Sequence, residues 1–187
     1  MAYKTRVFID FWNFQLNWNE RAGGDRIDWP AVPRVLVDEA RKKLEAAGIT
    51  EDLTLEETLV YASVNPEKEG PLRNFLEGFL DRQPSFRVKI RERKSKLRKI
   101  HCSSCGRDNE RCECGEPFMW APEKGVDTAI VTDLLSLAAD DAYSVAILLS
   151  SDADHIPAVE FVQSKRPQGH QCNLGEARLR PQANELG

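Results

Sequence analysis

The sequence has no long apolar run, and this absence excludes an integral membrane protein with helical spans. No stretch approaches the ~20 consecutive apolar residues that a membrane-spanning helix needs. The first ten residues, MAYKTRVFID, pass directly into a strand-like run, which predicts no signal peptide. No internal repeat is evident. We therefore expect a single-domain cytoplasmic protein with no membrane partner.

Cysteine is scarce, and its distribution is uneven. The chain has 187 residues and five cysteines, four of which lie between residues 102 and 114. A chain of this length buries roughly two thirds of the surface that its unfolded form exposes, so folding needs no disulfides. Because an intracellular chain does not use a disulfide scaffold, the cluster indicates a metal site. Cys172 stands apart and is predicted to be a packed free thiol.

One segment of an otherwise acidic chain has a strong net positive charge. The formal net charge is −4, but ten Lys/Arg face only three Asp/Glu between Arg87 and Arg111. This segment therefore carries +7 and the remainder −11. An acidic body with one basic arm favours an anionic partner that is held at a defined place. A solvated charged hairpin or helix face is the alternative, and charge alone does not decide between them.

Apolar periodicity predicts strands that alternate with helices. Strands are expected at residues 5–11, 57–64, 86–90, 143–149 and 169–174, and helices at 29–48, 66–81, 125–139 and 156–165. Residues 12–27 are polar and contain glycine, so they are predicted to form a loop. The alternation favours an α/β fold with a mainly parallel sheet.

Residues 91–122 interrupt this pattern, because they are basic, rich in cysteine and contain Pro117 and Pro122. We expect an inserted arm on a single domain that spans residues 1–187. Its root carries the residues predicted to hold nucleic-acid phosphates: Lys89, Arg91, Arg93, Lys94, Lys96, Arg98 and Lys99.

The cysteines of the arm form two closely spaced pairs, Cys102-x2-Cys105-Gly and Cys112-x-Cys114-Gly. Four thiolates at such spacing can surround one tetrahedral Zn²⁺, and the glycines allow the tight turns. A closed site of this kind is structural, and it would fold an arm that has few apolar residues. His101 is an alternative ligand, and a redox dithiol is the competing interpretation.

Four carboxylates lie where the ends of predicted elements should meet. Asp10 ends the first strand, Asp152 and Asp154 follow strand 143–149, and Asp127 opens a buried helix. Ligands of open parallel sheets collect beyond the carboxyl ends of the strands. Each Asp alone could be a helix cap or a turn former. Together they would repel one another, and a cation would relieve this. Oxygen ligands favour Mg²⁺ or Mn²⁺, which can activate water for phosphodiester hydrolysis.

Three segments resemble the signature blocks of the NYN domain family of PIN-like, metal-dependent ribonucleases. They are FIDFWNF (8–14), KGVDTAIVTDLL (124–135) and SSDADHIPAV (150–159), in the family's order. The resemblance covers most of the chain outside the arm. It implies a PIN-like, Rossmann-like three-layer sandwich around a mainly parallel sheet, here with a small zinc-finger-like insertion.

The resemblance also assigns roles to individual residues. Asp10, Asp127, Asp152 and Asp154 match the family's metal-binding aspartates, and Asn13 matches the Asn that follows the first of them. The family implies that the aspartates hold Mg²⁺ or Mn²⁺ and that a metal-activated water cleaves RNA. Asn13 would then orient the substrate or a water molecule.

Two positions depart from the family pattern, and one acidic residue is set aside. Ser151 stands where the family has Gly and could crowd a phosphate. His155 stands where the family has an aromatic residue, and it could bind phosphate, protonate a leaving group, or merely pack or face solvent. Asp133 lies about 240° around a helix from Asp127, so we expect it to serve structure.

The leading prediction is therefore a metal-dependent ribonuclease with catalytic Mg²⁺ or Mn²⁺, structural Zn²⁺ and single-stranded or structured RNA as its partner. The two departures motivate an alternative, a catalytically weak or inactive RNA-binding module. A DNA-directed nuclease is also open, because nothing in the sequence reads a 2′-hydroxyl, and so is a homo-oligomer. Four aromatic residues either stack on unpaired bases or pack in the core: Trp12, Phe14, Trp18 and Trp120.

Overall fold

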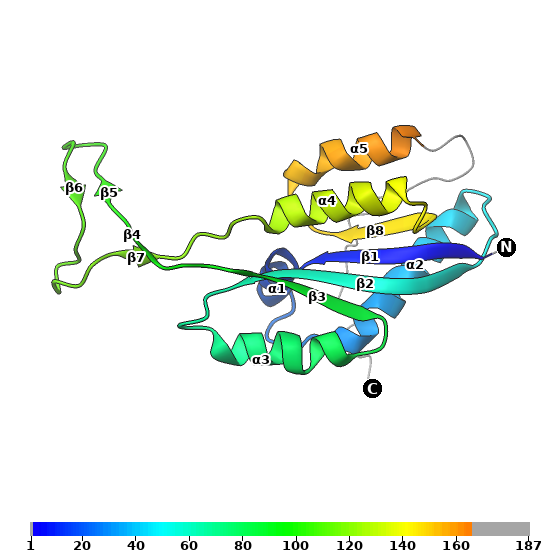
Figure 1. The fold of residues 1–187 in the computed structure, drawn as a ribbon, viewed down its shortest axis with the longest axis horizontal. Coiled ribbons are helices and arrows are strands. Elements are labelled where there is room, and N and C mark those ends of the chain that lie inside the picture. Colours follow the sequence, from blue (N-terminus) through cyan, green and yellow to red (C-terminus); the bar gives the residue numbers. More distant parts are fainter. Residues whose placement is uncertain (1, 166–187) are drawn as a thin grey trace.

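A parallel four-stranded sheet forms the centre of the protein. The computed structural model describes residues 2–165. The strands β1 (Tyr3–Asp10), β2 (Leu53–Val64), β3 (Phe86–Glu92) and β8 (Val145–Leu149) lie in the order β3-β2-β1-β8, and every pairing is parallel. Their carboxyl ends consequently share one edge of the sheet (Figure 1). The strand predicted at residues 169–174 and Cys172 lie outside the described residues.

Helices cover both faces of the sheet (Figure 1). One face packs against α1 (Phe11–Arg21), α2 (Val32–Ala46) and α3 (Gly70–Gly78), and the other against α4 (Val126–Ala139) and α5 (Ile156–Lys165). Strand β1 serves both cores, because successive side chains of a strand point to opposite faces. Val7 and Ile9 join the first core and Phe8 the second, and all three are fully buried.

The predicted α/β sandwich with a mainly parallel sheet is thus confirmed. Its layers account for the apolar character of β8, in which all five residues are buried. A strand with both faces covered has no side chain that needs to be polar. Three 3₁₀ helices complete the body: η1 (Trp29–Ala31), η2 (Leu80–Arg82) and η3 (Ala153–His155). Within residues 2–165, no helix is long and apolar enough to cross a bilayer.

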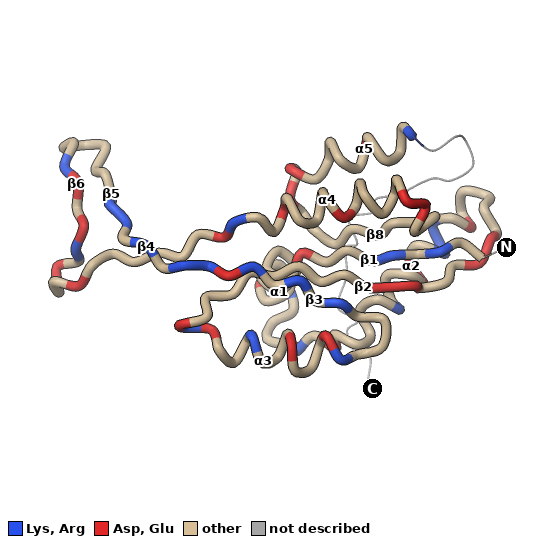
Figure 2. The backbone as a smooth tube through the Cα atoms, viewed as in Figure 1, with Lys and Arg blue, Asp and Glu red and all other residues tan. Residues whose placement is uncertain are grey.

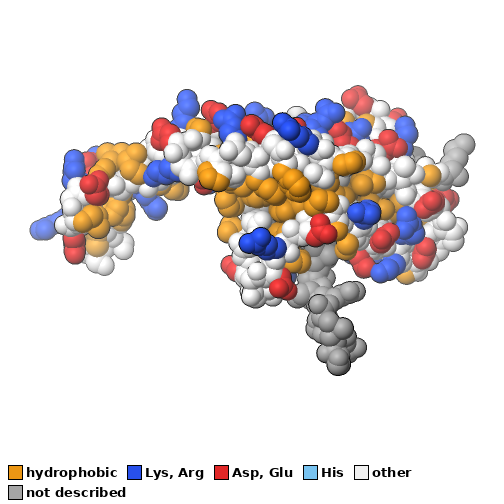
Figure 3. Space-filling view, turned by 90° about the horizontal axis from the view of Figure 1, so that it is seen from below, with side chains coloured by type: hydrophobic (Ala, Val, Ile, Leu, Met, Phe, Trp, Pro, Cys, Tyr) orange, Lys and Arg blue, Asp and Glu red, His pale blue; other side chains and the backbone are white. Residues whose placement is uncertain are grey.

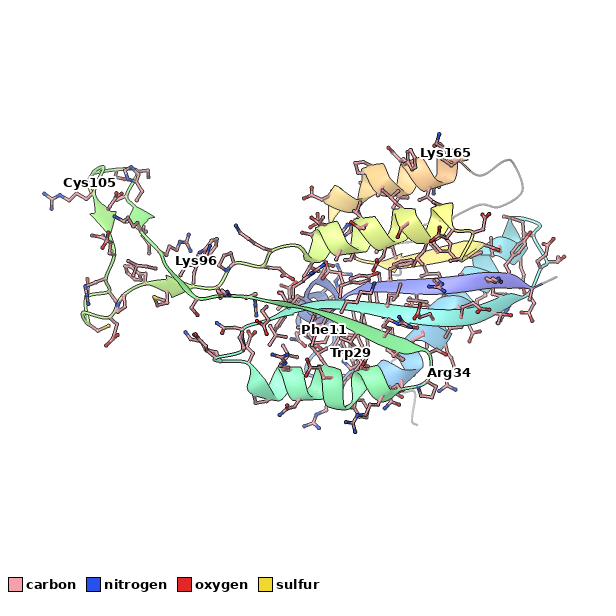
Figure 4. All side chains as sticks on the ribbon, viewed as in Figure 1. Phe11, Trp29, Arg34, Lys96, Cys105 and Lys165 are labelled. Atoms are coloured by element: carbon pink, nitrogen blue, oxygen red, sulfur yellow. The ribbon has the colours of Figure 1, made fainter. Side chains whose placement is uncertain are left out.

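The prediction of a loop over residues 12–27 is wrong for its first half, which is α1. The helix begins at an N-cap, Asp10, whose carboxylate accepts a backbone N–H of the first turn. Phe11 and Phe14 are one turn apart and are both buried against Trp29, with ring centroids 5.2 and 5.5 Å away. Figure 4 shows Phe11 and Trp29 close together beside the sheet. Aromatic burial therefore stabilises a helix whose other residues are mostly polar.

A long arm leaves the body between β3 and α4 (Figure 1). It contains two short antiparallel pairs, β4 (Lys96–Leu97) with β7 (Met119–Trp120) and β5 (Ile100–His101) with β6 (Asp108–Asn109). Its apolar side chains remain about half exposed, as in Trp120 (48%). The arm thus has no buried core among its described residues, and backbone pairing with a few side-chain contacts at its surface maintains its shape.

Candidate metal centre

The candidate centre lies at the carboxyl edge of the sheet, where Asp10 ends β1. This side chain is buried, with 6% of the residue exposed. Its carboxylate accepts the backbone N–H of Asn13 at 3.2 Å and the hydroxyl of Ser150 at 3.4 Å. These two donors fix the carboxylate at the junction of β1, α1 and the end of β8, so its orientation is set before any ligand arrives.

Three side chains converge here from distant parts of the chain. One oxygen of Asp10, one oxygen of Asp127 and one ring nitrogen of His155 all lie within 4.8 Å of one another. Asp127 is in the first turn of α4, and His155 ends η3. Gly125 directs the chain into α4 with a φ of +79°, a conformation that glycine adopts without strain. The sheet and this turn together bring three candidate ligands close to one another, although they are far apart in the sequence.

His155 is the unexpected member of the group. It is 1% exposed, and neither of its ring nitrogens has a hydrogen-bond partner in the described structure. Surface exposure, one of the readings left open by the sequence, is therefore wrong. A buried polar group without a partner loses about 1–3 kcal/mol relative to a satisfied one. An orphaned imidazole facing two carboxylates fits a bound cation, which would provide the missing partner.

Burial dominates the electrostatics of Asp10. It raises the pKa of the Asp10 carboxyl above its usual range, and the nearby negative charge of Asp127 raises it further. The N–H of Asn13, the charge of His155 and the hydroxyl of Ser150 act in the opposite direction. Burial thus disfavours the ionised form of Asp10 relative to that of an exposed aspartate, and a divalent ion between these side chains would offset this effect.

Asp152 and Asp154 stand outside this group. Both are exposed, and the carboxylate of Asp152 accepts the backbone N–H of Asp154 at 2.9 Å. This contact caps η3, the turn that carries His155. The arrangement gives Asp152 a structural task, and its predicted role as a metal ligand stays a prediction, as does that of Asp154.

Asn13 ties the first helix to the same turn. Its side-chain oxygen accepts the backbone N–H of Ser151 at 2.8 Å and the hydroxyl of Ser151 at 3.0 Å. Asn17 adds a contact of 3.3 Å to that hydroxyl. Both donors of Ser151 therefore bind Asn13, and the Ser in place of Gly is part of a link between α1 and the segment after β8. An orienting role for Asn13 toward substrate or water stays a prediction.

Sequence reasoning overlooked Glu123, the last acidic residue of the arm. Burial raises the pKa of its carboxyl above the usual range, and the negative charges of Asp10 and Asp127 contribute to the shift. A third acidic side chain thus lies near the centre, on a different segment of the chain. Its position directly before the KGVD block, in EKGVD, is the signal that could have identified it.

Asp133 has the structural role that its position on the helix predicts. Its carboxylate accepts the hydroxyl of Tyr61 at 2.7 Å and pairs with the ammonium of Lys89 at 2.5 Å. Burial, followed by the contact with Asp133, raises the pKa of the Tyr61 hydroxyl well above its usual range. Because Lys89 is committed to this contact, it is a poor candidate for binding phosphate.

Two further basic residues are also engaged. The guanidinium of Arg93 donates to Glu69 at 2.5 and 2.6 Å and lies over the ring of Trp12, 5.3 Å from its centroid. Lys99 pairs with Glu110 at 2.5 Å. These contacts brace the root of the arm, which leaves fewer free cations than the sequence predicts.

The remaining basic side chains project from the arm's root, where Lys and Arg follow one another along the backbone (Figure 2). Arg91, Lys94 and Lys96 are exposed and make no ion pair with any described residue. Arg98 lies over the half-exposed ring of Trp120, 5.1 Å from its centroid. The root of the arm thus exposes the Arg98–Trp120 pair and three cations without an ion-pair partner among the described residues.

The four cysteines lie in two separate turns, which we call half-sites, and the closed zinc site stays a prediction. Backbone N–H groups lower the pKa of the Cys102 thiol, chiefly that of Cys105, and the N–H of Cys114 does the same for Cys112. Such turns favour thiolates, the form that binds metal. Yet among residues 2–165 the four sulfurs do not come close enough to share one ion. His101 instead faces Asp108, with 2.7 Å between Nδ1 and Oδ1.

The fold and the centre define a PIN-like α/β domain with side chains suited to a divalent metal. The chain belongs to the NYN domain family, whose pattern it matches over residues 4–169. This family is generally nuclease-like. No curated protein matches the chain. A solved structure, that of a protein of unknown function from Vibrio parahaemolyticus, is 18% identical over 88% of this chain and 76% of that one, with a TM-score of 0.45. A likeness of this size carries no argument about activity.

Proposed function

We propose that the protein is a metal-dependent nuclease that hydrolyses phosphodiester bonds in RNA. The observation that carries this proposal is the group formed by Asp10, Asp127 and His155 at the carboxyl edge of a NYN domain. Two carboxylates and an orphaned imidazole form a donor set that fits a divalent cation. When bound, such an ion supplies positive charge for a phosphate oxygen and lowers the pKa of a coordinated water.

The chain's own residues prepare the site for that chemistry. Asp10 and Asp127 would hold the ion, with Asp152 and Asp154 as further candidates that a phosphate substrate could bring into play. Asn13 holds the turn after β8 in place, so the geometry needs little rearrangement when substrate binds. Mg²⁺ and Mn²⁺ are the candidate ions.

The basic arm favours a single-stranded nucleic acid as the substrate, and we propose RNA. Arg91, Lys94 and Lys96 are free to contact phosphates on the same edge of the protein as the centre, and Trp120 offers a stacking surface for an unpaired base. On the face seen in Figure 3, hydrophobic side chains gather along the middle of the body and on the arm.

The proposal is tested with the full chain and a panel of single-stranded RNA, single-stranded DNA and duplexes. We expect RNA cleavage with Mn²⁺ or Mg²⁺ and none with EDTA. Asp10→Asn should slow cleavage by at least about a hundredfold, because it removes charge at the metal. Asp140→Asn is the matched control, since Asp140 is exposed at the end of α4. Cleavage by Asp10→Asn at the unaltered rate would show that the site is wrongly assigned.

A non-catalytic RNA-binding module is the second candidate. The half-exposed Trp120 beside Arg98 favours it, because this pair can bind nucleic acid without any metal chemistry. Binding that persists in EDTA, with no cleavage in any metal, would support this module against the nuclease. Preferential cutting of single-stranded DNA would support the DNA-directed alternative.

Structural zinc in the arm is a separate proposal. The lowered thiol pKa values of Cys102 and Cys112 support it, and so do the two tight turns at Gly106 and Gly115, which have φ values of +69° and +86°. A Zn²⁺ ion would draw the two half-sites together. Metal analysis of reduced protein should give one zinc per chain, and Cys105→Ser should abolish it. A zinc content near zero would exclude the site.

A further inference from the structure

We infer that His155 is a metal ligand of the centre through one ring nitrogen, and that it makes the site select a first-row transition-metal ion over Mg²⁺. This inference deepens the proposed function and rests on its metal centre. It concerns the residue at which the chain departs from the family pattern, and it assigns that residue a role in metal specificity.

The burial of His155 is the first observation. The side chain is almost completely enclosed, with 1% of the residue exposed, and both ring nitrogens lack a partner in the described part of the chain. Buried polar groups in proteins are nearly always satisfied by another group, a water or an ion. Coordination gives one of these nitrogens the partner that no described residue supplies.

The distances around the group are the second observation. The nitrogen of His155 and the oxygens of Asp10 and Asp127 lie within 4.8 Å of one another. Ligands on opposite sides of an ion, each bonded at about 2.1 Å, are about 4.2 Å apart. Small side-chain rotations therefore suffice to place all three around one ion.

The third observation is that the backbone holds His155 in this position. Asp152 caps η3 through the N–H of Asp154 at 2.9 Å, and Ser151 is fixed to Asn13 by two hydrogen bonds of 2.8 and 3.0 Å. The turn is thus fixed on the N-terminal side of the imidazole. A ligand that is preset in this way loses little conformational freedom on binding.

The donor set determines which ion fits. Mg²⁺ prefers oxygen ligands and retains several waters, whereas imidazole favours transition metals. A nitrogen that replaces an oxygen therefore weakens Mg²⁺ binding relative to Mn²⁺ and the later ions of the row. Thiolates bind Mn²⁺ poorly, so Mn²⁺ also discriminates this centre from the cysteines of the arm.

The direct test is pulsed electron paramagnetic resonance of Mn²⁺ added to the metal-stripped full chain. We expect ¹⁴N modulation from one coordinated imidazole, which changes when the histidines are labelled with ¹⁵N. His155→Phe, which restores the aromatic character of the family position, should remove the modulation and weaken Mn²⁺ binding by about tenfold or more in calorimetry. His101→Phe is the matched control, because His101 lies exposed on the arm.

His155→Asp provides the converse test, because it gives the centre a third carboxylate and should narrow the preference for Mn²⁺ over Mg²⁺ by about tenfold. Absence of nitrogen coupling in the unaltered protein would overturn the inference, even if a variant failed to fold. Equal Mn²⁺ affinity in His155→Phe would overturn it too. In either case, metal-dependent RNA cleavage would leave the proposed function intact, whereas loss of cleavage with normal nitrogen coupling would overturn only the function.

Discussion

The carboxyl edge of the sheet and the arm are built in opposite ways, although they adjoin each other. At the sheet edge Asp10 and His155 are buried, and hydrogen bonds fix the turns that carry the candidate ligands. On the arm three of the four thiols are exposed, the ring of Trp120 is half-exposed, and short strand pairs and surface contacts maintain the shape. The first region is organised by the protein's own core. The second has no buried core among the described residues.

The largest effect is expected from a substitution that removes hydrogen bonds at the carboxyl edge of the sheet. Asn13→Ala removes the acceptor that holds both donors of Ser151, so the turn bearing His155 should loosen. We expect metal affinity to fall by about tenfold to a hundredfold, as for other residues that orient ligands. Calorimetry with Mn²⁺ measures this change. Asn19→Ala on the same helix is the control, since Asn19 contacts only Gln15 among the hydrogen bonds described, and equal losses in both variants would contradict the role of Asn13.

Removing charge from the arm should weaken nucleic-acid binding without affecting the centre. Replacing Arg91, Lys94 and Lys96 together with Gln should reduce RNA affinity by about tenfold or more at low salt. The slope of log affinity against log salt should fall by about 2, because each phosphate contact on a single strand contributes about 0.7. Filter binding at several salt concentrations measures both quantities. Lys99→Gln should have a smaller effect, because Lys99 already pairs with Glu110, and an unchanged slope in the triple variant would exclude the arm as the phosphate contact.

Trp120 tests whether the arm stacks on bases as well as holding phosphates. Trp120→Ala should weaken binding of single-stranded RNA by roughly 1–3 kcal/mol, which is typical of one base–aromatic contact. The salt slope should stay the same, because no charge is removed. Phe161→Ala is the control, as Phe161 is exposed to a similar degree on α5, away from the arm. A similar loss in both variants would show that general surface hydrophobicity is responsible.

The smallest expected effect is on stability and concerns the ion pair of Arg93 and Glu69, at the root of the arm. Burial raises the pKa of Glu69, but the N–H of Asn65 and the guanidinium of Arg93 outweigh it and leave the pKa below its usual range. The stabilisation that ionised Glu69 provides is therefore present at pH values above the pKa of Glu69 in the unfolded chain. It disappears as the pH falls through the lower pKa of Glu69 in the folded protein. Glu69→Gln should reduce the free energy of unfolding by about 1 kcal/mol at pH 7 and by less at pH 3. Thermal unfolding at both pH values measures the difference in stability between the unaltered protein and Glu69→Gln. A difference at pH 3 as large as that at pH 7 would contradict this account.

Local patterns in the sequence predict much of the fold, because β1, β2, β8 and most of the helices bury apolar residues. Helix α1 was missed because its buried residues, Phe11 and Phe14, are separated by polar ones and become a helical face only against Trp29. That partner lies beyond a glycine-containing loop, so the decisive contact is tertiary. Propensity over residues 12–27 alone could not reveal it.

The sequence likewise predicts part of the candidate site and not the rest. Asp10 and Asp127 are marked by their places at a strand end and a helix start, and the structure brings them together. His155 has no such mark, since a lone histidine gives no periodic signal and its position depends on the cap made by Asp152. The cysteine pairs are a third case: their spacing predicts one zinc site, and this stays a prediction that metal analysis can test.

The connection from β3 to α4 has a consequence for how such proteins diversify. It carries the chain from one outer edge of the sheet to the helix layer on the opposite face, and β4 pairs with β7 close to the body. Whatever lies beyond that pairing can lengthen, shorten or change composition without altering the register of the sheet. The arm can thus vary in length and sequence while the body, with its candidate metal centre, stays the same. Replacing it should leave Asp10, Asp127 and His155 in place at the carboxyl edge of the sheet.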